Sequence, residues 1–330
     1  MFRVTSLAEM PDKQLNRWIK RLALLLVVGV VAFAAFYAVD RWRPATAPIV
    51  DRELTTLEAA VRADPSDVAS RGRLADLYYA KQRFADAIAQ YTILIDANKE
   101  VELASLGRAR AYEQTDQYAA AITDYQKVID IAKEGEMANV DPTLAAAYYG
   151  LGAVALEQGR AKDAIDPLTK ALAIQRTDAD ALNAIARAYL QTGQPKLAID
   201  RLTLAVSLVP TGWAEPYRNL ETAYGQTGNA DMAEWAGAMA AFVDGDTATA
   251  EQRLTAIAGG AHALEAAIGL GIVTEAKGDT AAAAEWYRKA LAIDPRNMSA
   301  TLGLGRVAAP SPAASTAPSS PAASPAEGNN

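Results

Sequence analysis

The 330-residue sequence contains no cysteine, which excludes disulfide bonds, thiolate catalysis, cysteine metal ligands and a lipid-anchoring thiol. It contains one histidine, His262, so a multi-histidine zinc or iron site is excluded as well. The formal net charge of -7 provides no basic excess for binding phosphates, which argues against nucleic acid as a partner. The acidic balance itself mainly indicates solubility.

Motifs for catalysis are equally scarce. The stretch GLGAVA, residues 150–155, matches the dinucleotide fingerprint G-x-G-x-x-A, but the preceding TLAAAYY indicates a helix where the fingerprint needs a strand. Similar stretches at 269–274 and 303–308 occupy the same phase of a repeat, which favours helix packing over three cofactor sites. A phosphate loop needs a Gly-Lys pair, and the sequence contains none. No pair of acidic residues stands out as a candidate for carboxylate catalysis. We therefore expect that the protein is not an enzyme and that it binds no cofactor and no metal ion. An enzyme whose active site has no recognisable motif is the weakest alternative.

One long apolar run is present, at residues 22–39 (LALLLVVGVVAFAAFYAV). Eighteen uncharged residues at about 1.5 Å each nearly span a hydrocarbon core of about 30 Å. The basic residues before the run predict a cytoplasmic N-terminus, although Arg41 and Arg43 after it weaken the asymmetry. A cleavable signal peptide is the alternative, since ATAP at 45–48 supplies small residues for cleavage. We expect an uncleaved signal-anchor: residues 1–21 cytoplasmic, 22–39 a transmembrane helix of the inner membrane, and the rest outside the cytoplasm.

Small residues recur along the chain at a fixed distance. The segments AKDAIDPLTKALAI (161–174) and PKLAIDRLTLAVSL (195–208) superpose at an offset of 34 residues, with Ala164 on Ala198. The same offset relates Ala87 to Ala121. Self-similarity at a fixed period indicates a repeat architecture, in which the small residues serve the packing of repeated units and not a local site.

The period and the residues around it resemble the tetratricopeptide repeat. The best-matching unit contains Leu182, Ile185, Ala186, Tyr189, Gly193, Ala198, Leu202, Ala205 and Pro210. The resemblance covers residues 64–297 and implies an all-α, right-handed solenoid of about six helical hairpins. It also implies a packing role for Ala87, Ala121, Gly152, Ala164, Ala198, Ala205, Ala233 and Ala283. Gly193 is expected to end a first helix in the left-handed conformation.

Two spacings depart from the period. Ala121 and Ala164 are 43 residues apart, which predicts a longer turn around KEGEMANVD. Ala233 and Ala250 are only 17 apart, which predicts that the helix near 230–243 closes one hairpin and opens the next.

The ends of the chain differ from the repeats. Residues 40–63 are expected to form a linker and an N-terminal cap helix, and residues 298–309 a C-terminal cap helix. Residues 310–330 are rich in proline, serine and alanine, so we expect them to be disordered.

The first helices of stacked hairpins line the concave side of a solenoid. Projection of the repeat phase places six residues there: Tyr79, Arg110, Tyr149, Asn183, Arg187 and Arg218. In members of the family, such Asn and basic residues can clamp a peptide backbone or a terminal carboxylate, although solubility alone also explains them here. The chain resembles bacterial membrane-anchored adaptors and assembly or chaperone factors, which implies a scaffold for protein or peptide partners. The alternative is self-assembly into a homo-oligomer through the open solenoid ends.

Overall fold

The computed structural model of the protein describes residues 49–308, which form helices and contain no strand. The helices are α2 (Ile49–Ala63), α3 (Val68–Ala80), α4 (Phe84–Asp96), α5 (Val101–Glu113), α6 (Tyr118–Ala132), η2 (Ala138–Val140), α7 (Pro142–Glu157), α8 (Ala161–Ile174), α9 (Ala179–Gln191), α10 (Pro195–Leu208), α11 (Glu215–Thr227), α12 (Ala230–Val243), α13 (Thr247–Ile257), α14 (Ala263–Ala276), α15 (Thr280–Ile293) and α16 (Met298–Ala308). In this part of the chain, none of the helices combines the length and the apolarity that a bilayer crossing requires. The predicted cytoplasmic segment 1–21, transmembrane helix 22–39 and tail 310–330 lie outside the described residues, as do residues 40–48 of the predicted linker.

Local signals in the sequence set the helix ends. The side chain of Asp178 accepts a hydrogen bond from the backbone N–H of Ala181 and caps the start of α9. Gly193 follows the end of α9 with φ +72°, a left-handed conformation that costs glycine little, as predicted. The long turn predicted after α6 is also confirmed, because residues 133–141 separate α6 from α7 and contain only the short helix η2.

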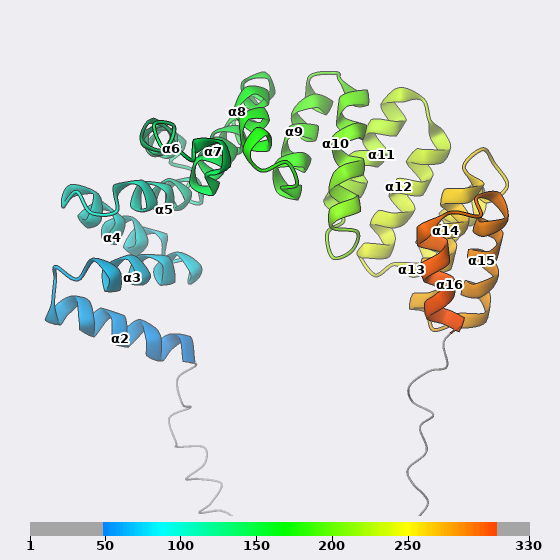
Figure 1. Cartoon of the computed structure of the whole chain (residues 1–330), viewed down its shortest axis with the longest axis horizontal. Helices are drawn as coiled ribbons and strands as arrows, with labels where there is room; N and C mark the ends of the chain where they lie inside the picture. The colour runs from blue at the N-terminus through cyan, green and yellow to red at the C-terminus, as the bar shows by residue number, and fades with distance from the viewer. Residues whose placement is uncertain (1–48, 309–330) are drawn as a thin grey trace, which may run out of the picture.

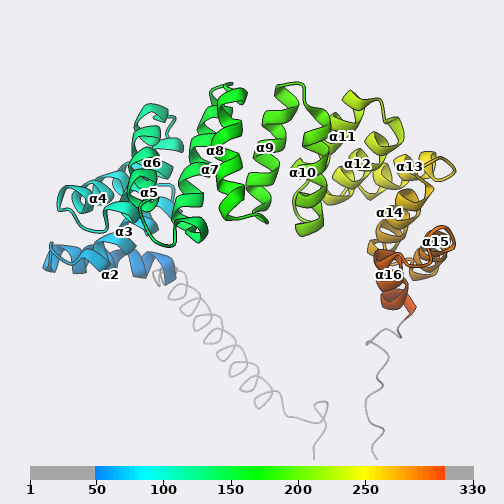
Figure 2. The same cartoon turned by 45° about the horizontal axis from the view of Figure 1, so that its top comes forward.

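Successive helices pair as hairpins that stack into an arch (Figure 1). The first helices of neighbouring hairpins contact one another in the order α3, α5, α7, α9 and α11. Among the described helices, no comparable contact joins the second helices α4, α6, α8 and α10. In a curved stack, the helices of the inner row lie closer together than those of the outer row. The first helices α3, α5, α7, α9 and α11 therefore line the inner face. Figure 2 shows that α2 and α16 stand at opposite ends of the arch.

Helix α12 belongs to two hairpins. It packs against α11 as a second helix, and it also packs against α13 and contacts α14 as a first helix would. A second row of neighbouring helices therefore starts at α12 and runs through α14 to α16. The prediction drawn from the short spacing of 17 residues is confirmed.

The small residues with a predicted packing role are buried. Six of the predicted packing alanines have no exposed surface: Ala87, Ala121, Ala164, Ala198, Ala205 and Ala283. Ala233 differs from the expectation, because it is only partly buried while Ala236 and Ala240 of the same helix are buried in the core. The reason is the double role of α12, which must pack on both sides and therefore turns a different face toward α11.

A bulky residue follows most crossing alanines by four positions and fills the space between hairpins. In α6 this residue is Tyr125, whose ring lies against Gly150 of the next first helix, α7. Its hydroxyl donates a hydrogen bond to Oε2 of Glu113 in α5 at 2.6 Å. Gly152 lies against Leu168 of α8, the second helix of its own hairpin. The GLG stretch at 150–152 is therefore explained by close helix packing.

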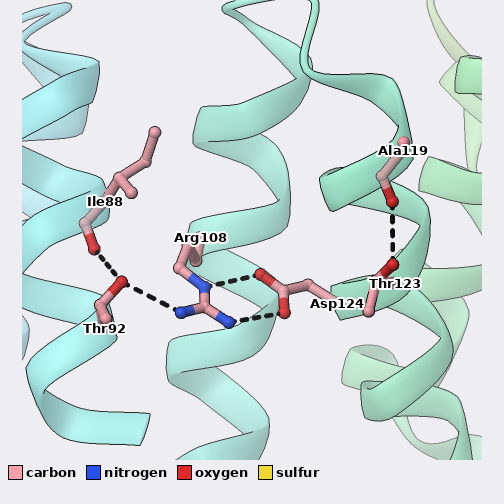
Figure 3. A network of polar contacts seen from close by, with 6 residues as sticks. All are labelled: Ile88, Thr92, Arg108, Ala119, Thr123 and Asp124. Carbon is pink, nitrogen blue, oxygen red and sulfur yellow. Dashed lines mark hydrogen bonds and ion pairs between the residues drawn. The ribbon is translucent and has the colours of Figure 1, made fainter. Parts of the chain in front are cut away.

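A buried ion pair joins three consecutive helices (Figure 3). The guanidinium of Arg108 in α5 donates two hydrogen bonds to the carboxylate of Asp124 in α6, at 2.7 and 2.8 Å. A third bond runs from Arg108 to the hydroxyl oxygen of Thr92 in α4 at 3.0 Å, and that hydroxyl donates to the carbonyl of Ile88. Asp124 is only 3% exposed. The hydrogen bond to Asp124 raises the pKa of Arg108, so the guanidinium stays charged although it is largely buried.

Candidate functional site

The inner face of the arch contains a pocket of about 370 Å³, which is lined by α7, α9, the end of α5 and the turn that leads to Tyr118 at the start of α6. Two of the six predicted inner-face residues, Tyr149 of α7 and Arg187 of α9, line it together. Small side chains, among them Ala153 and Ala184, leave the space open. Tyr149 and Arg187 are thus the two predicted inner-face residues that this pocket brings together.

Tyr149 is half-buried in this pocket. Burial is the main reason that its pKa rises to about 12, and the negative charges of Asp180, Glu113 and Asp178 raise it further. The positive charge of Arg187 acts in the opposite direction and lowers the pKa of Tyr149. Tyr149 is therefore neutral at physiological pH, in surroundings that are on balance acidic.

Arg187 lies between two carboxylates. Its Nη2 is 3.4 Å from Oε1 of Glu157, and its Nε is 3.8 Å from Oε1 of Glu215. The guanidinium thus joins α9 to the neighbouring inner helices α7 and α11. A peptide carboxylate would have to compete with both glutamates for this cation.

Asn183 is a correction to the predicted inner surface. It is only 4% exposed, and its Oδ1 accepts a hydrogen bond of 2.8 Å from Nδ2 of Asn219 in α11. Inner helices α9 and α11 are in contact, so a polar residue at this phase meets the next helix instead of solvent. Asn183 therefore joins two repeats and is not free to clamp a ligand through that oxygen.

The other three predicted residues lie outside the pocket lining. Tyr79 of α3 is half-buried and meets Phe84 edge to face, with ring centroids 5.5 Å apart. Arg110 of α5 is exposed. Arg218 of α11 is exposed and forms an ion pair with Asp244, the residue that ends α12. These three residues lie on helices of the inner row, but they do not line the pocket.

Sequence reasoning missed the acidic residues of the pocket. Glu113, at the last position of α5, lines it together with Asp116 and Glu157. Burial raises the pKa of the Glu113 carboxyl, against the opposing effects of its bond from Tyr125 and the charge of Arg110. The sequence does show that these acidic residues stand at or just after the ends of first helices. It does not show that they lie close together, because that distance depends on how the hairpins stack.

The outer face has a second pocket, of about 490 Å³, between α6, α7 and α8. Its charged side chains are largely satisfied within the chain, for example by the ion pairs Arg160–Asp163 and Lys170–Asp166. Within residues 49–308 there is no group of three or more His, Asp or Glu side chains that could hold a metal ion. The inner pocket is therefore the better candidate for binding a ligand.

Family models for the tetratricopeptide repeat match most of the described chain. One matches residues 100–177, a second matches 155–223, and a third matches 51–98 and 236–298. A comparison with curated proteins finds no match.

Solved structures of other proteins are similar to the chain. A structure of MamA is 26% identical over 53% of this chain and 96% of its own, with a TM-score of 0.45. YrrB, described as a TPR protein with an unusual peptide-binding site, is 18% identical over 59% of this chain and 96% of its own, with a TM-score of 0.46. The C-terminal part of a TPR repeat-containing protein from Cytophaga hutchinsonii is 18% identical over 77% of this chain and 94% of its own, with a TM-score of 0.48.

Proposed function

We propose that this chain, which belongs to the tetratricopeptide repeat family, is a scaffold that binds extended segments of partner proteins along the inner face of its arch. The observation that carries the proposal is the inner pocket, where Tyr149 and Arg187 meet between three consecutive first helices. A stack of such helices offers one continuous surface to a ligand, which suits an extended chain better than a small molecule. The protein would act by bringing partners together, without chemistry of its own.

We also propose that residues 22–39 anchor the scaffold in the inner membrane, with the N-terminus in the cytoplasm and the arch outside it. The support is the uncharged run of eighteen residues and its basic flank. An anchor confines the inner face to the bilayer surface and raises the effective concentration of any partner held there, so weak contacts suffice. This geometry fits a role in assembling or chaperoning envelope complexes.

Site-specific photo-crosslinking in cells tests the scaffold. A photoreactive residue at Tyr149 should crosslink to one or a few defined proteins, because that position faces the proposed partner. The matched position is Thr169 of α8, an exposed residue on a second helix, where the same photoreactive residue should give none of these products. Deleting residues 22–39 should move the protein from the membrane to the soluble fraction and reduce the yield. Identical products from both positions, or none from the inner one, would contradict the proposal.

Self-assembly is a second candidate, favoured by the last helix of the arch. Met298 and Leu302, one turn apart on α16, are 68% and 57% exposed. If copies join there, the doubly substituted Met298→Lys/Leu302→Lys protein should sediment as a smaller species than the wild type at the same concentration. Leu204→Lys on α10 removes an exposed leucine elsewhere and should leave the sedimentation unchanged. A wild type that stays monomeric at every concentration would eliminate this candidate.

A further inference from the structure

The inner pocket carries an excess of negative charge. Among the side chains that line it, the carboxylates of Glu113, Asp116 and Glu157 outnumber one guanidinium, that of Arg187. Arg187 is in turn paired with Glu157 and with Glu215 next to the pocket. The one cation of the lining is thus neutralised within the protein, and the charge left for a ligand is negative.

Glu113 has an oxygen to offer to a ligand. Its Oε2 accepts the hydrogen bond from Tyr125, whereas no hydrogen bond or ion pair of Oε1 is found among the described residues. Burial disfavours the charged form of this carboxyl and raises its pKa, although the charge of Arg110 partly opposes this effect. A cation placed beside Glu113 would restore the attraction that burial removes, because charge-assisted hydrogen bonds are stronger than neutral ones.

Tyr149 supplies an aromatic surface in the same pocket. A lysine or arginine within about 6 Å of a ring centroid is attracted by the negative face of the ring. The acidic groups around Tyr149, namely Asp178, Asp180 and Glu113, make its surroundings more favourable for a cation and less favourable for a carboxylate.

We propose that the inner pocket binds the lysine or arginine side chain of an extended partner segment. The acceptors are Oε1 of Glu113 and Oε2 of Glu157, the carboxylate oxygens that the bonds to Tyr125 and Arg187 leave unused among the described residues, and Tyr149 is the aromatic wall. The inference rests on the proposed function and names the chemistry of the partner that the function leaves open. The volume of about 370 Å³ is near the lower end of ligand pockets, about 300 Å³, which suits one long side chain and not a folded element. This chemistry is the opposite of the terminal-carboxylate clamp that Asn and basic residues can form in members of the family, because Glu157 and Glu215 are already paired with Arg187 here.

Fluorescence anisotropy of the full-length protein with three dye-labelled peptides tests the inference. The peptides share one length and a serine–glycine backbone, and they carry lysine, glutamate or methionine at the same alternating positions. We expect the lysine peptide to bind more tightly than both others, with an affinity that falls as salt is added. Glu113→Gln/Glu157→Gln should weaken binding of the lysine peptide about tenfold, because neutral amides replace both charged acceptors.

The matched control removes the same number of charges from the outer face. Asp163→Asn/Asp166→Asn alters two exposed residues of α8 and changes the net charge of the protein equally, so it should leave the affinity for the lysine peptide within about twofold. Equal loss in both double variants would show general electrostatic attraction and overturn the site. Equal affinity for the three peptides would overturn it as well. Circular dichroism of each variant checks that the helices are intact.

Failure of this inference and failure of the scaffold give different results. If the three peptides bind equally while crosslinks from position 149 persist, the inner face binds partners but the cation pocket is wrong. If the crosslinks are also absent, the proposed function itself is wrong.

Discussion

Replacing Gly150 with alanine should lower the free energy of unfolding by about 3 kcal/mol, the upper end of the usual cost of overpacking. A Cβ atom at this position would lie 2.2 Å from Cζ of Tyr125 and within 2.6 Å of both neighbouring ring carbons. The ring cannot retreat easily, because Tyr125 is only 1% exposed and its hydroxyl is bonded to Glu113. The two hairpins would have to separate or the tyrosine would have to leave its rotamer. Urea denaturation followed by circular dichroism measures the loss.

Gly225→Ala is the matched control. Gly225 also lies inside a helix, α11, but a Cβ there would meet no atom within 4 Å. Alanine is the better helix former, so this variant should gain about 0.5 to 1 kcal/mol. The same substitution is thus expected to have opposite signs at the two glycines. If Gly150→Ala proves as stable as the wild type, the close contact between hairpins that Tyr125 and Gly150 make is not as described.

Removing one partner of the buried pair in α5 and α6 should have an effect at least as large. In Arg108→Met, the carboxylate of Asp124 stays buried, loses two hydrogen bonds and has no cation to balance its charge. An uncompensated buried charge of this kind costs about 3 to 5 kcal/mol. The urea concentration at the midpoint of unfolding should fall accordingly. The decrease should be larger for the helices around α5 than for the rest of the array.

Two further variants separate the buried charge from other causes. Arg108→Met/Asp124→Leu replaces both charges with apolar groups, so most of the lost stability should return. Lys170→Met breaks an exposed pair, in which Lys170 and Asp166 have 51% and 75% of their side-chain surface accessible, and should cost less than about 1 kcal/mol. A double variant no more stable than Arg108→Met would show that the arginine matters through packing and not through charge.

The fold was largely predictable because its main constraint is local and periodic. A small residue is needed wherever two helices of a hairpin cross, so alanines such as Ala164 and Ala198 recur at the period of the hairpin. Gly193 and the long turn after α6 follow from signals within a few residues. The irregular spacing before Ala250 was informative for the same reason, since it reports that one helix is shared.

The candidate site was predictable only in part, because it depends on contacts between repeats. The repeat phase assigned Tyr149 and Arg187 to the inner row, and both line the pocket. The same phase misplaced Asn183, because sequence spacing does not report that α11 approaches closely enough for Asn219 to cover it. It also gave no sign that Arg187 is paired with glutamates from two neighbouring helices, which compete with any ligand carboxylate for its guanidinium.

The shared helix α12 also has a consequence for how the array comes apart. In a stack where each hairpin contacts only its neighbours, unfolding can stop at any joint between hairpins and leave the rest intact. The hairpins α11–α12 and α12–α13 have no boundary between them, because they share α12. Unfolding of α12 would expose the faces of α11 and of α13 at the same time. We therefore expect helices α11 to α13 to melt as one cooperative block, and a truncation that leaves folded protein should end before α11 or after α13.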